Sequence, residues 1–143
     1  NRLSYTVIGD EVNLGARLEA ANKYYGTHSM ISERTYELAK DHIEVRELDM
    51  IRVVGKEKPV KVYELIDRKG QLQEVKLEVL KLYEEGLKMY RKREWQMAID
   101  MFQEALNKDP LDGPSLTYTE RCRGYVQNPP PENWDGVFVL TTK

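Results

Sequence analysis

Cysteine and histidine are scarce in this sequence of 143 residues. Its one cysteine, Cys122, has no partner for an internal disulfide, and chains without a cysteine framework are typical of reducing compartments. The two histidines, His28 and His42, have no acid or cysteine at a spacing that suits a metal, so we expect neither to be a ligand. These absences predict a cytoplasmic location.

Long apolar runs are missing as well. A helical membrane span needs roughly 20 apolar residues, and the first residues also lack the basic-then-apolar layout of a signal peptide. Charged residues make up 32% of the chain but nearly cancel, to a formal net charge of -2, which disfavours a nucleic-acid partner. The chain opens on Asn1 rather than methionine and has a strand pattern from Leu3, so we expect it to be cut from a larger protein.

The first 68 residues alternate between strand and helix patterns, which indicates an α/β module with a sheet. Asp10 suits the N-cap of the first predicted helix and Gly26 its end, while Ser32 suits the N-cap of the second. The predicted strands cover residues 5–8, 28–32, 43–48, 50–54 and 60–66, and the predicted helices cover residues 12–25 and 32–40.

From residue 69 the strand pattern stops and apolar residues fall at helical spacing. The predicted helices cover residues 72–90, 94–107 and 114–125. The proline-led segment 129–143 is expected to be an extended tail. We therefore expect an α+β chain, with an α/β sheet module over residues 1–68, an all-α helical hairpin appendage over residues 69–128, and the tail.

Five residues of the helical segment have the spacing of the tetratricopeptide repeat: Gly86, Ala98, Phe102, Ala105 and Pro110. The small residues let antiparallel helices touch, the aromatic ring fills the gap between them, and the proline ends the second helix. About three repeats are needed for independent stability, and this chain has one repeat and one further helix. Either the helices pack against the α/β module or a second copy as a structural appendage, or they dock a protein partner.

An amide and a guanidinium share one side of the first predicted helix. Asn13 and Arg17 lie four residues apart near its N-terminus, so both side chains can address one ligand. A helix N-terminus carries partial positive charge and free amides, which suits phosphate and ribose oxygens. A solvated face, or a hydrogen bond to a neighbouring loop, is the alternative that the spacing alone leaves open.

The stretch RLSYTVIGDEVNLGARLEAANKYYGTHSMIS closely resembles the C-terminal half of the catalytic domain of class III adenylate/guanylate cyclases, especially bacterial ones. The segments ERTYELAK, REL and IRVVGKEKPVKVYELI and the closing PPPENWDGVFVLTTK also look like such cyclases, so the resemblance covers the whole chain. It implies part of a ferredoxin-like catalytic sheet. It also implies an enzyme that converts ATP into 3′,5′-cyclic AMP and pyrophosphate.

The resemblance assigns roles to individual residues. Asn13 would orient the ribose, Arg17 would stabilise the α-phosphate in the transition state, and Thr6 falls at the base-recognition position, where its hydroxyl favours ATP over GTP. The family's two metal-binding aspartates and its base-contacting lysine belong to a region upstream of Asn1. Magnesium or manganese is therefore expected in the full-length enzyme and none on this chain, because Asp10 falls at a helix cap rather than at the metal site.

One departure concerns the phosphate-binding lysine of the family, which is replaced by Val54. Arg52 and Lys56 are candidate substitutes, and the alternative is that both are ordinary solvent-facing residues of a hairpin. Because the family's site lies between two catalytic domains, we expect this chain to carry half of a site, to meet ATP in the full-length dimer and to be inactive alone.

Three further expectations follow from the resemblance. A sheet without its first strands has open edges, so we expect self-association as a homodimer or a domain-swapped dimer. Many such cyclases are membrane-anchored, and the parent protein is compatible with an anchor that leaves this part on the cytosolic side. The rival functions are a catalytically inactive, cyclase-derived regulatory or protein-interaction module, and a free-standing nucleotide-binding module.

Overall fold

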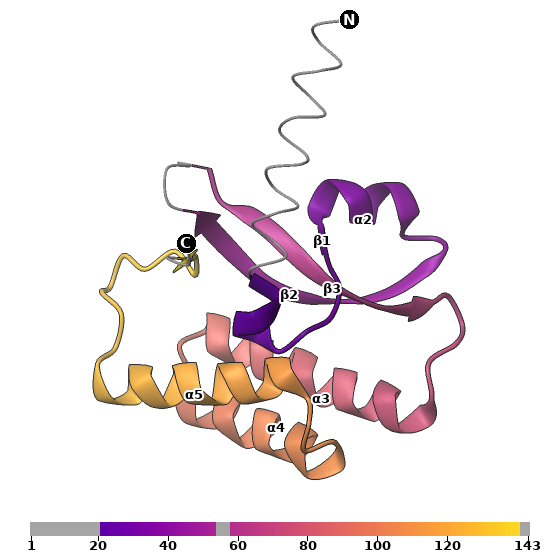
Figure 1. The fold of residues 1–143 in the computed structure, drawn as a ribbon. Coiled ribbons are helices and arrows are strands. Elements are labelled where there is room, and N and C mark those ends of the chain that lie inside the picture. The colour runs from indigo at the N-terminus through magenta and orange to yellow at the C-terminus, as the bar shows by residue number, and fades with distance from the viewer. Residues whose placement is uncertain (1–20, 54–57, 141–143) are drawn as a thin grey trace, which may run out of the picture.

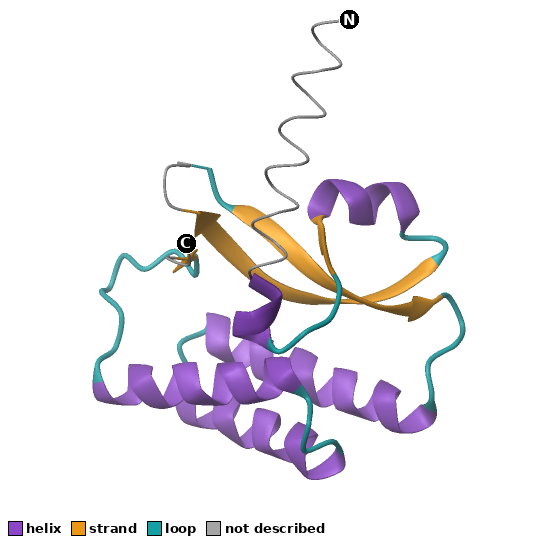
Figure 2. Ribbon diagram, in the orientation of Figure 1, coloured by secondary structure: helices purple, strands orange, loops and turns teal. Residues whose placement is uncertain are grey.

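The computed structural model describes residues 21–53 and 58–140 (Figure 1). Residues 21–25 are helical, and Gly26 follows them with a φ of +66°. The remaining elements are β1 (Met30–Ser32), α2 (Glu33–Ala39), β2 (Ile43–Val53), β3 (Val60–Arg68), α3 (Glu74–Arg91), α4 (Trp95–Lys108), α5 (Gly113–Gln127) and β4 (Phe138–Leu140). Helices α3, α4 and α5 form a layer below the sheet in Figure 2. The predicted α+β fold class, with a helical C-terminal part, is confirmed.

The four strands form one sheet in the order β1-β3-β2-β4. Strand β3 pairs antiparallel with both β1 and β2, whereas β4 pairs parallel with β2. Parallel neighbours need a long crossover, and here the crossover contains the whole helical layer. Residues 138–140 of the predicted tail thus lie in the same sheet as the first described strands.

Strand β2 is continuous where the sequence predicted two strands. Its register with β3 shifts between Glu47 and Asp49, so Leu48 has no opposite residue. A bulge of this kind adds one residue to a strand and bends it. Leu48 and Asp49 are consequently both buried, at 0% and 1% exposure, although neighbouring residues of a regular strand face opposite sides.

The three predicted helices of the C-terminal part are confirmed, with ends one to two residues from the predicted ones. Helix α3 packs along α4, and Gly86 of α3 lies under the ring of Phe102 of α4. A Cβ atom on Gly86 would lie 2.6 Å from Cε1 of Phe102, so only glycine permits this approach. The predicted cap of α2 is also present, since Oγ of Ser32 accepts a hydrogen bond from the amide of Thr35 at 3.2 Å.

Two hydrophobic clusters meet along β2. The helical cluster contains Tyr83, Leu87, Tyr90, Ala98, Ile99, Phe102, Tyr118 and Cys122, and the sheet cluster contains Ala21, Tyr25, Leu48, Ile51 and Val62. Tyrosine hydroxyls join them, because Tyr83 donates to the carbonyl of Glu47 at 2.8 Å and Tyr118 donates to the carbonyl of Leu48. The helices thus supply hydrogen-bond donors where β2 bulges.

Candidate functional site

Most of the residues predicted to bind substrate lie outside the described residues. These are Thr6, Asn13, Arg17 and Lys56. Asp10, the predicted N-cap residue, and Val54, which replaces the family's lysine, also lie outside the described residues. Arg52 is described, and it lies near the C-terminal end of β2, next to the undescribed residues 54–57. The roles of the undescribed residues therefore stay predictions.

Arg52 faces a carboxylate from the C-terminal segment. Its Nη2 atom lies 3.7 Å from Oδ2 of Asp135, and the two side chains are 36% and 57% exposed. An exposed pair of this kind contributes about 0–1 kcal/mol to stability. The Arg52 guanidinium therefore keeps contact with solvent, where an anion can compete with Asp135.

The helical layer supports the segment that follows Arg17 in the chain. Residues 21–26 lie against the start of α5, where a Cβ atom on Gly113 would be 2.4 Å from the carbonyl oxygen of Gly26. Oγ1 of Thr117 also donates to the carbonyl of Tyr24 at 3.1 Å. A displacement of α5 would accordingly move the end of the helix in which Asn13 and Arg17 are predicted.

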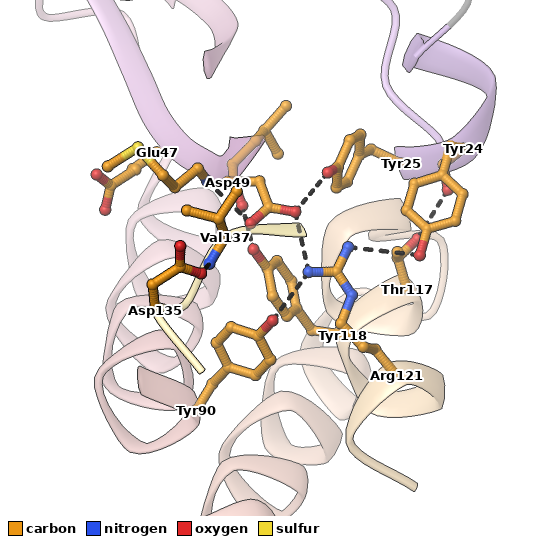
Figure 3. A network of polar contacts seen from close by, with 12 residues as sticks. Tyr24, Tyr25, Glu47, Asp49, Tyr90, Thr117, Tyr118, Arg121, Asp135 and Val137 are labelled. Atoms are coloured by element: carbon orange, nitrogen blue, oxygen red, sulfur yellow. Dashed lines mark hydrogen bonds and ion pairs between the residues drawn. The ribbon is translucent and has the colours of Figure 1, made fainter. Parts of the chain in front are cut away.

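Arg121 of α5 forms a buried ion pair with Asp49 of β2, with Nη1 and Oδ2 2.9 Å apart (Figure 3). Asp49 also accepts hydrogen bonds from the Tyr25 hydroxyl and, at 2.9 Å, from the amide of Met50. The side chains of Arg121 and Asp49 are 4% and 2% exposed. A charge in such a place requires a partner with good geometry, and each of these two residues provides it for the other.

Aromatic side chains surround the Arg121 guanidinium. Its Nη1 donates to the Tyr90 hydroxyl at 3.1 Å, and its Cζ lies 3.7 Å from the centre of the Phe138 ring and 4.7 Å from that of Tyr118. The cation thus contacts α3, β2 and β4 in addition to its own helix. Burial raises the pKa of Tyr90 and Tyr118 above the usual range, so both hydroxyls stay protonated and neutral.

A second buried ion pair joins Arg46 of β2 to Asp112, the N-cap residue of α5. Arg46 donates through Nη1 to one Asp112 oxygen at 2.9 Å and through Nη2 to the other, while its Nε donates to Glu64 at 2.6 Å. Burial on its own would raise the pKa of Asp112, but the hydrogen bonds and charge of Arg46 outweigh it and hold that pKa below its usual range. Ser115 also donates to Asp112.

These buried groups support the fold rather than react. Both ion pairs are compensated, and burial raises the pKa of the Cys122 thiol to about 12, so it is not a thiolate nucleophile at neutral pH. In residues 21–53 and 58–140, no three side chains of histidine, cysteine, aspartate or glutamate gather in a way that fits a metal ion. The magnesium or manganese that the resemblance implies for the full-length enzyme stays a prediction.

A cleft of about 420 Å³ opens between the sheet, the corner between α3 and α4, and the C-terminal segment. Its lining consists of Met50, Lys61, Arg91, Arg93, Trp134, Asp135 and Gly136. Beside it, Glu47 pairs with Lys61 at 3.0 Å and with Arg91 at 2.8 Å. The cleft thus has three cationic side chains, those of Lys61, Arg91 and Arg93, and two carboxylates in or beside it, those of Asp135 and Glu47. Positive charge is therefore in excess.

No pattern in the sequence indicated the two ion pairs. Asp49 and Arg121 lie 72 residues apart, and Arg46 and Asp112 lie 66 residues apart. Spacing rules detect neighbours on one helix or strand, not partners at this separation. The one local signal is that Asp49 separates the two strand patterns at residues 43–48 and 50–54, because aspartate is depleted in strands.

The part of the chain that the structure describes contains no helix with the length and apolar character of a membrane span. No protein-family model matches the chain, and no solved structure matches it significantly.

Two named adenylate cyclases are similar to the chain in sequence. One is the terminal-differentiation-specific adenylate cyclase of Dictyostelium discoideum, with 33% identity over 132 residues, which cover 90% of this chain and 6% of that protein. The other is adenylate cyclase 1 of Rhizobium meliloti (strain 1021), with 37% identity over 65 residues, which cover 46% of this chain and 10% of that protein. The chain thus spans a tenth or less of these relatives. Over most of its length it is a region related in sequence to adenylate cyclases.

Proposed function

We propose that the chain is the C-terminal portion of an adenylate cyclase catalytic region and supplies the half-site that orients ATP. The supporting observation is the similarity to the Dictyostelium cyclase over 90% of the chain. A match of that extent leaves 10% of 143 residues, about 14, unmatched, so it includes β1 to β3 and all three helices of the C-terminal part. The sequence segments that form the sheet and the helical layer therefore both have counterparts in a protein named for this activity.

In the proposed reaction the ribose 3′-oxygen forms a bond to the α-phosphorus while the bond to the pyrophosphate oxygen breaks. Asn13 would hold the ribose so that this oxygen is in line, and Thr6 would bind the adenine edge. Negative charge grows on the phosphoryl oxygens in the transition state, and Arg17 would stabilise it. Arg52, and Lys56 beside it in sequence, would replace the family's phosphate-binding lysine.

We further propose that these 143 residues do not form cyclic AMP by themselves, as a monomer or as a homodimer. By the resemblance, the metal-binding aspartates come from the other half of a composite site. A homodimer of this chain would pair two copies of the same half. Magnesium or manganese bound in the complete site would assist the attack on phosphorus.

For the helical layer, we propose a tetratricopeptide-like hairpin, formed by α3 and α4, that serves as a structural support. The close approach of Gly86 to Phe102 supports the hairpin, and the buried pairs of β2 with α5 support its role in holding the sheet. The alternative, a catalytically inactive regulatory module, is favoured by Val54, because no lysine stands at the phosphate-binding position.

A chimera tests the proposed function in a complete enzyme. The matched region of the Dictyostelium cyclase is replaced by this chain, and cyclic AMP formation is measured. We expect an active chimera that loses about 100-fold or more of its activity in the Arg17→Ala variant, because one transition-state contact contributes that much. The matched control is Arg123→Ala, which removes an exposed arginine of α5 and should leave the activity unchanged. A folded chimera without activity, or one indifferent to Arg17→Ala, contradicts the proposal.

A further inference from the structure

The segment from residue 129 to residue 140, which we call the strap, leaves the end of α5 and returns to the sheet (Figure 1). It begins with Pro129, Pro130 and Pro131, which have no amide hydrogen to donate. It ends as β4, which pairs with only three residues of β2. Few backbone hydrogen bonds therefore hold the strap, and such segments open locally at a lower free energy than helices.

Arg93, at the corner between α3 and α4, holds the first part of the strap. Its Nη2 and Nη1 atoms donate to the carbonyls of Pro130 and Pro131 at 2.6 and 2.9 Å. Its Cζ lies 5.9 Å from the ring centre of Trp95 and 5.8 Å from that of Trp134. One guanidinium thus joins the two sides through two charge-assisted hydrogen bonds and two aromatic rings.

The backbone of Arg93 adds a second, independent observation. Its φ is +65°, and it alone among the described residues other than glycine has a positive φ. Glycine or asparagine usually takes this position after a helix, because an L side chain costs about 1 kcal/mol there. Arginine is thus an unusual residue at this position, and its contacts with the strap offer a reason for it.

The closed strap places a carboxylate against a cation of the sheet. Asp135 lies 3.7 Å from Arg52, and Trp134, Asp135 and Gly136 form one side of the cleft described above. Phe138 anchors the far end, stacked on Tyr24 with ring centres 5.3 Å apart. Between Arg93 and this anchor, Trp134 packs edge-on against Tyr90 and Trp95, with ring centres 5.4 and 5.5 Å apart, so opening would also break these ring contacts.

We propose that the strap is a releasable device and that Arg93 is its latch. When the contacts between Arg93 and the strap break, residues 130–137 move away from the surface and the cleft opens. The Asp135 carboxylate then no longer lies beside Arg52. Arg52 is a cation that we assign to substrate phosphates, so the regulatory meaning of this release rests on the proposed function. The opening of the strap does not depend on the proposed function.

The test uses two variants of the full 143-residue chain. Arg93→Gly and Arg93→Asn both keep a residue that adopts a positive φ and both remove the guanidinium. We expect hydrogen exchange in residues 132–140 to become faster by about tenfold or more, because two charge-assisted hydrogen bonds are lost. Exchange within α3 and α4 should stay unchanged. Lys92→Ala, which removes an exposed cation one residue earlier, should behave like the original protein.

A chemical readout follows Arg52 directly. Phenylglyoxal modifies accessible arginines, and we expect Arg52 to react several times faster in both variants, relative to Arg123 on the same chain. If both variants showed the exchange and labelling rates of the original protein, the proposal that Arg93 holds the strap would be wrong. Faster exchange throughout α3, α4 and the strap would overturn it too, because Arg93 would then be a general stability residue. Neither measurement involves ATP, so both can be interpreted even if the proposed function is wrong.

Discussion

At the residue scale, two arginines connect the helical layer to the sheet. Arg121 and Arg46 are each buried against an aspartate, and Arg121 also contacts α3 through the Tyr90 hydroxyl and β4 through the Phe138 ring. Loss of either Arg121 or Asp49 would leave the other as an uncompensated buried charge, which costs about 3–5 kcal/mol, whereas Arg46 would keep Glu64 if Asp112 were lost. Both pairs join β2 to α5.

The Asp112 carboxylate makes the stability of the fold depend on pH. Its pKa is lowered in the folded chain, so the stability that it contributes is complete above the unfolded value of about 3.9 and is lost as the pH falls through the lower, folded pKa. We expect Asp112→Asn to lower the midpoint of thermal unfolding at pH 6, and this difference to shrink between about pH 4 and pH 2.

Thermal unfolding followed by circular dichroism across this pH range makes the measurement. Asp41→Asn is the matched control, because Asp41 is exposed, and its curve should run parallel to that of the original protein. A difference between Asp112→Asn and the original protein that stays constant down to pH 2 would contradict the assigned direction of the pKa.

At the element scale, helix α3 depends on a glycine to pack against α4. A Cβ atom on Gly86 would lie 2.6 Å from Phe102, whereas one on Gly124 of α5 would meet nothing within 4 Å. Both glycines are helical, so alanine gains about 1 kcal/mol of helix propensity at either position. Only the change at Gly86 also overpacks a core.

We expect Gly86→Ala to lower the free energy of unfolding by about 1–3 kcal/mol, because strain in an overpacked core exceeds the gain in propensity. We expect Gly124→Ala to raise the same free energy by up to about 1 kcal/mol. Urea denaturation of both variants gives the two values. Equal and stabilising effects at both positions would show that the contact between Gly86 and Phe102 is not tight.

The elements themselves were largely predictable, since each follows from a local pattern. Apolar residues at helical spacing predicted α3 to α5, and a run of β-branched residues predicted β3. The bulge at Leu48 and the return of β4 to the sheet were not predicted, because both depend on partners distant in the sequence. Of the candidate site, sequence reasoning singled out Arg52. It did not find Asp135, the partner of Arg52, which lies 83 positions further along the chain.

At the scale of the whole molecule, the sheet and the helical layer share buried contacts on both sides of the predicted boundary at residues 68 and 69. Both ion pairs, the Tyr83 and Tyr118 hydroxyls and strand β4 cross it. The helical layer also touches residues 21–26, which follow Arg17. We infer that the layer positions the helix of the proposed half-site, which explains why one relative matches both parts.

The central claim is that this chain carries the ATP-orienting half of a composite cyclase site and lacks the metal-binding half. The most direct measurement is cyclic AMP formation after the purified chain is mixed with a cyclase catalytic domain that keeps its two metal-binding aspartates but has lost its own asparagine and arginine. We predict no cyclic AMP from either protein alone, clear formation from the mixture, and none when the chain carries Asn13→Ala and Arg17→Ala. Cyclic AMP from the chain alone, or formation in the mixture that survives both substitutions, would contradict the claim.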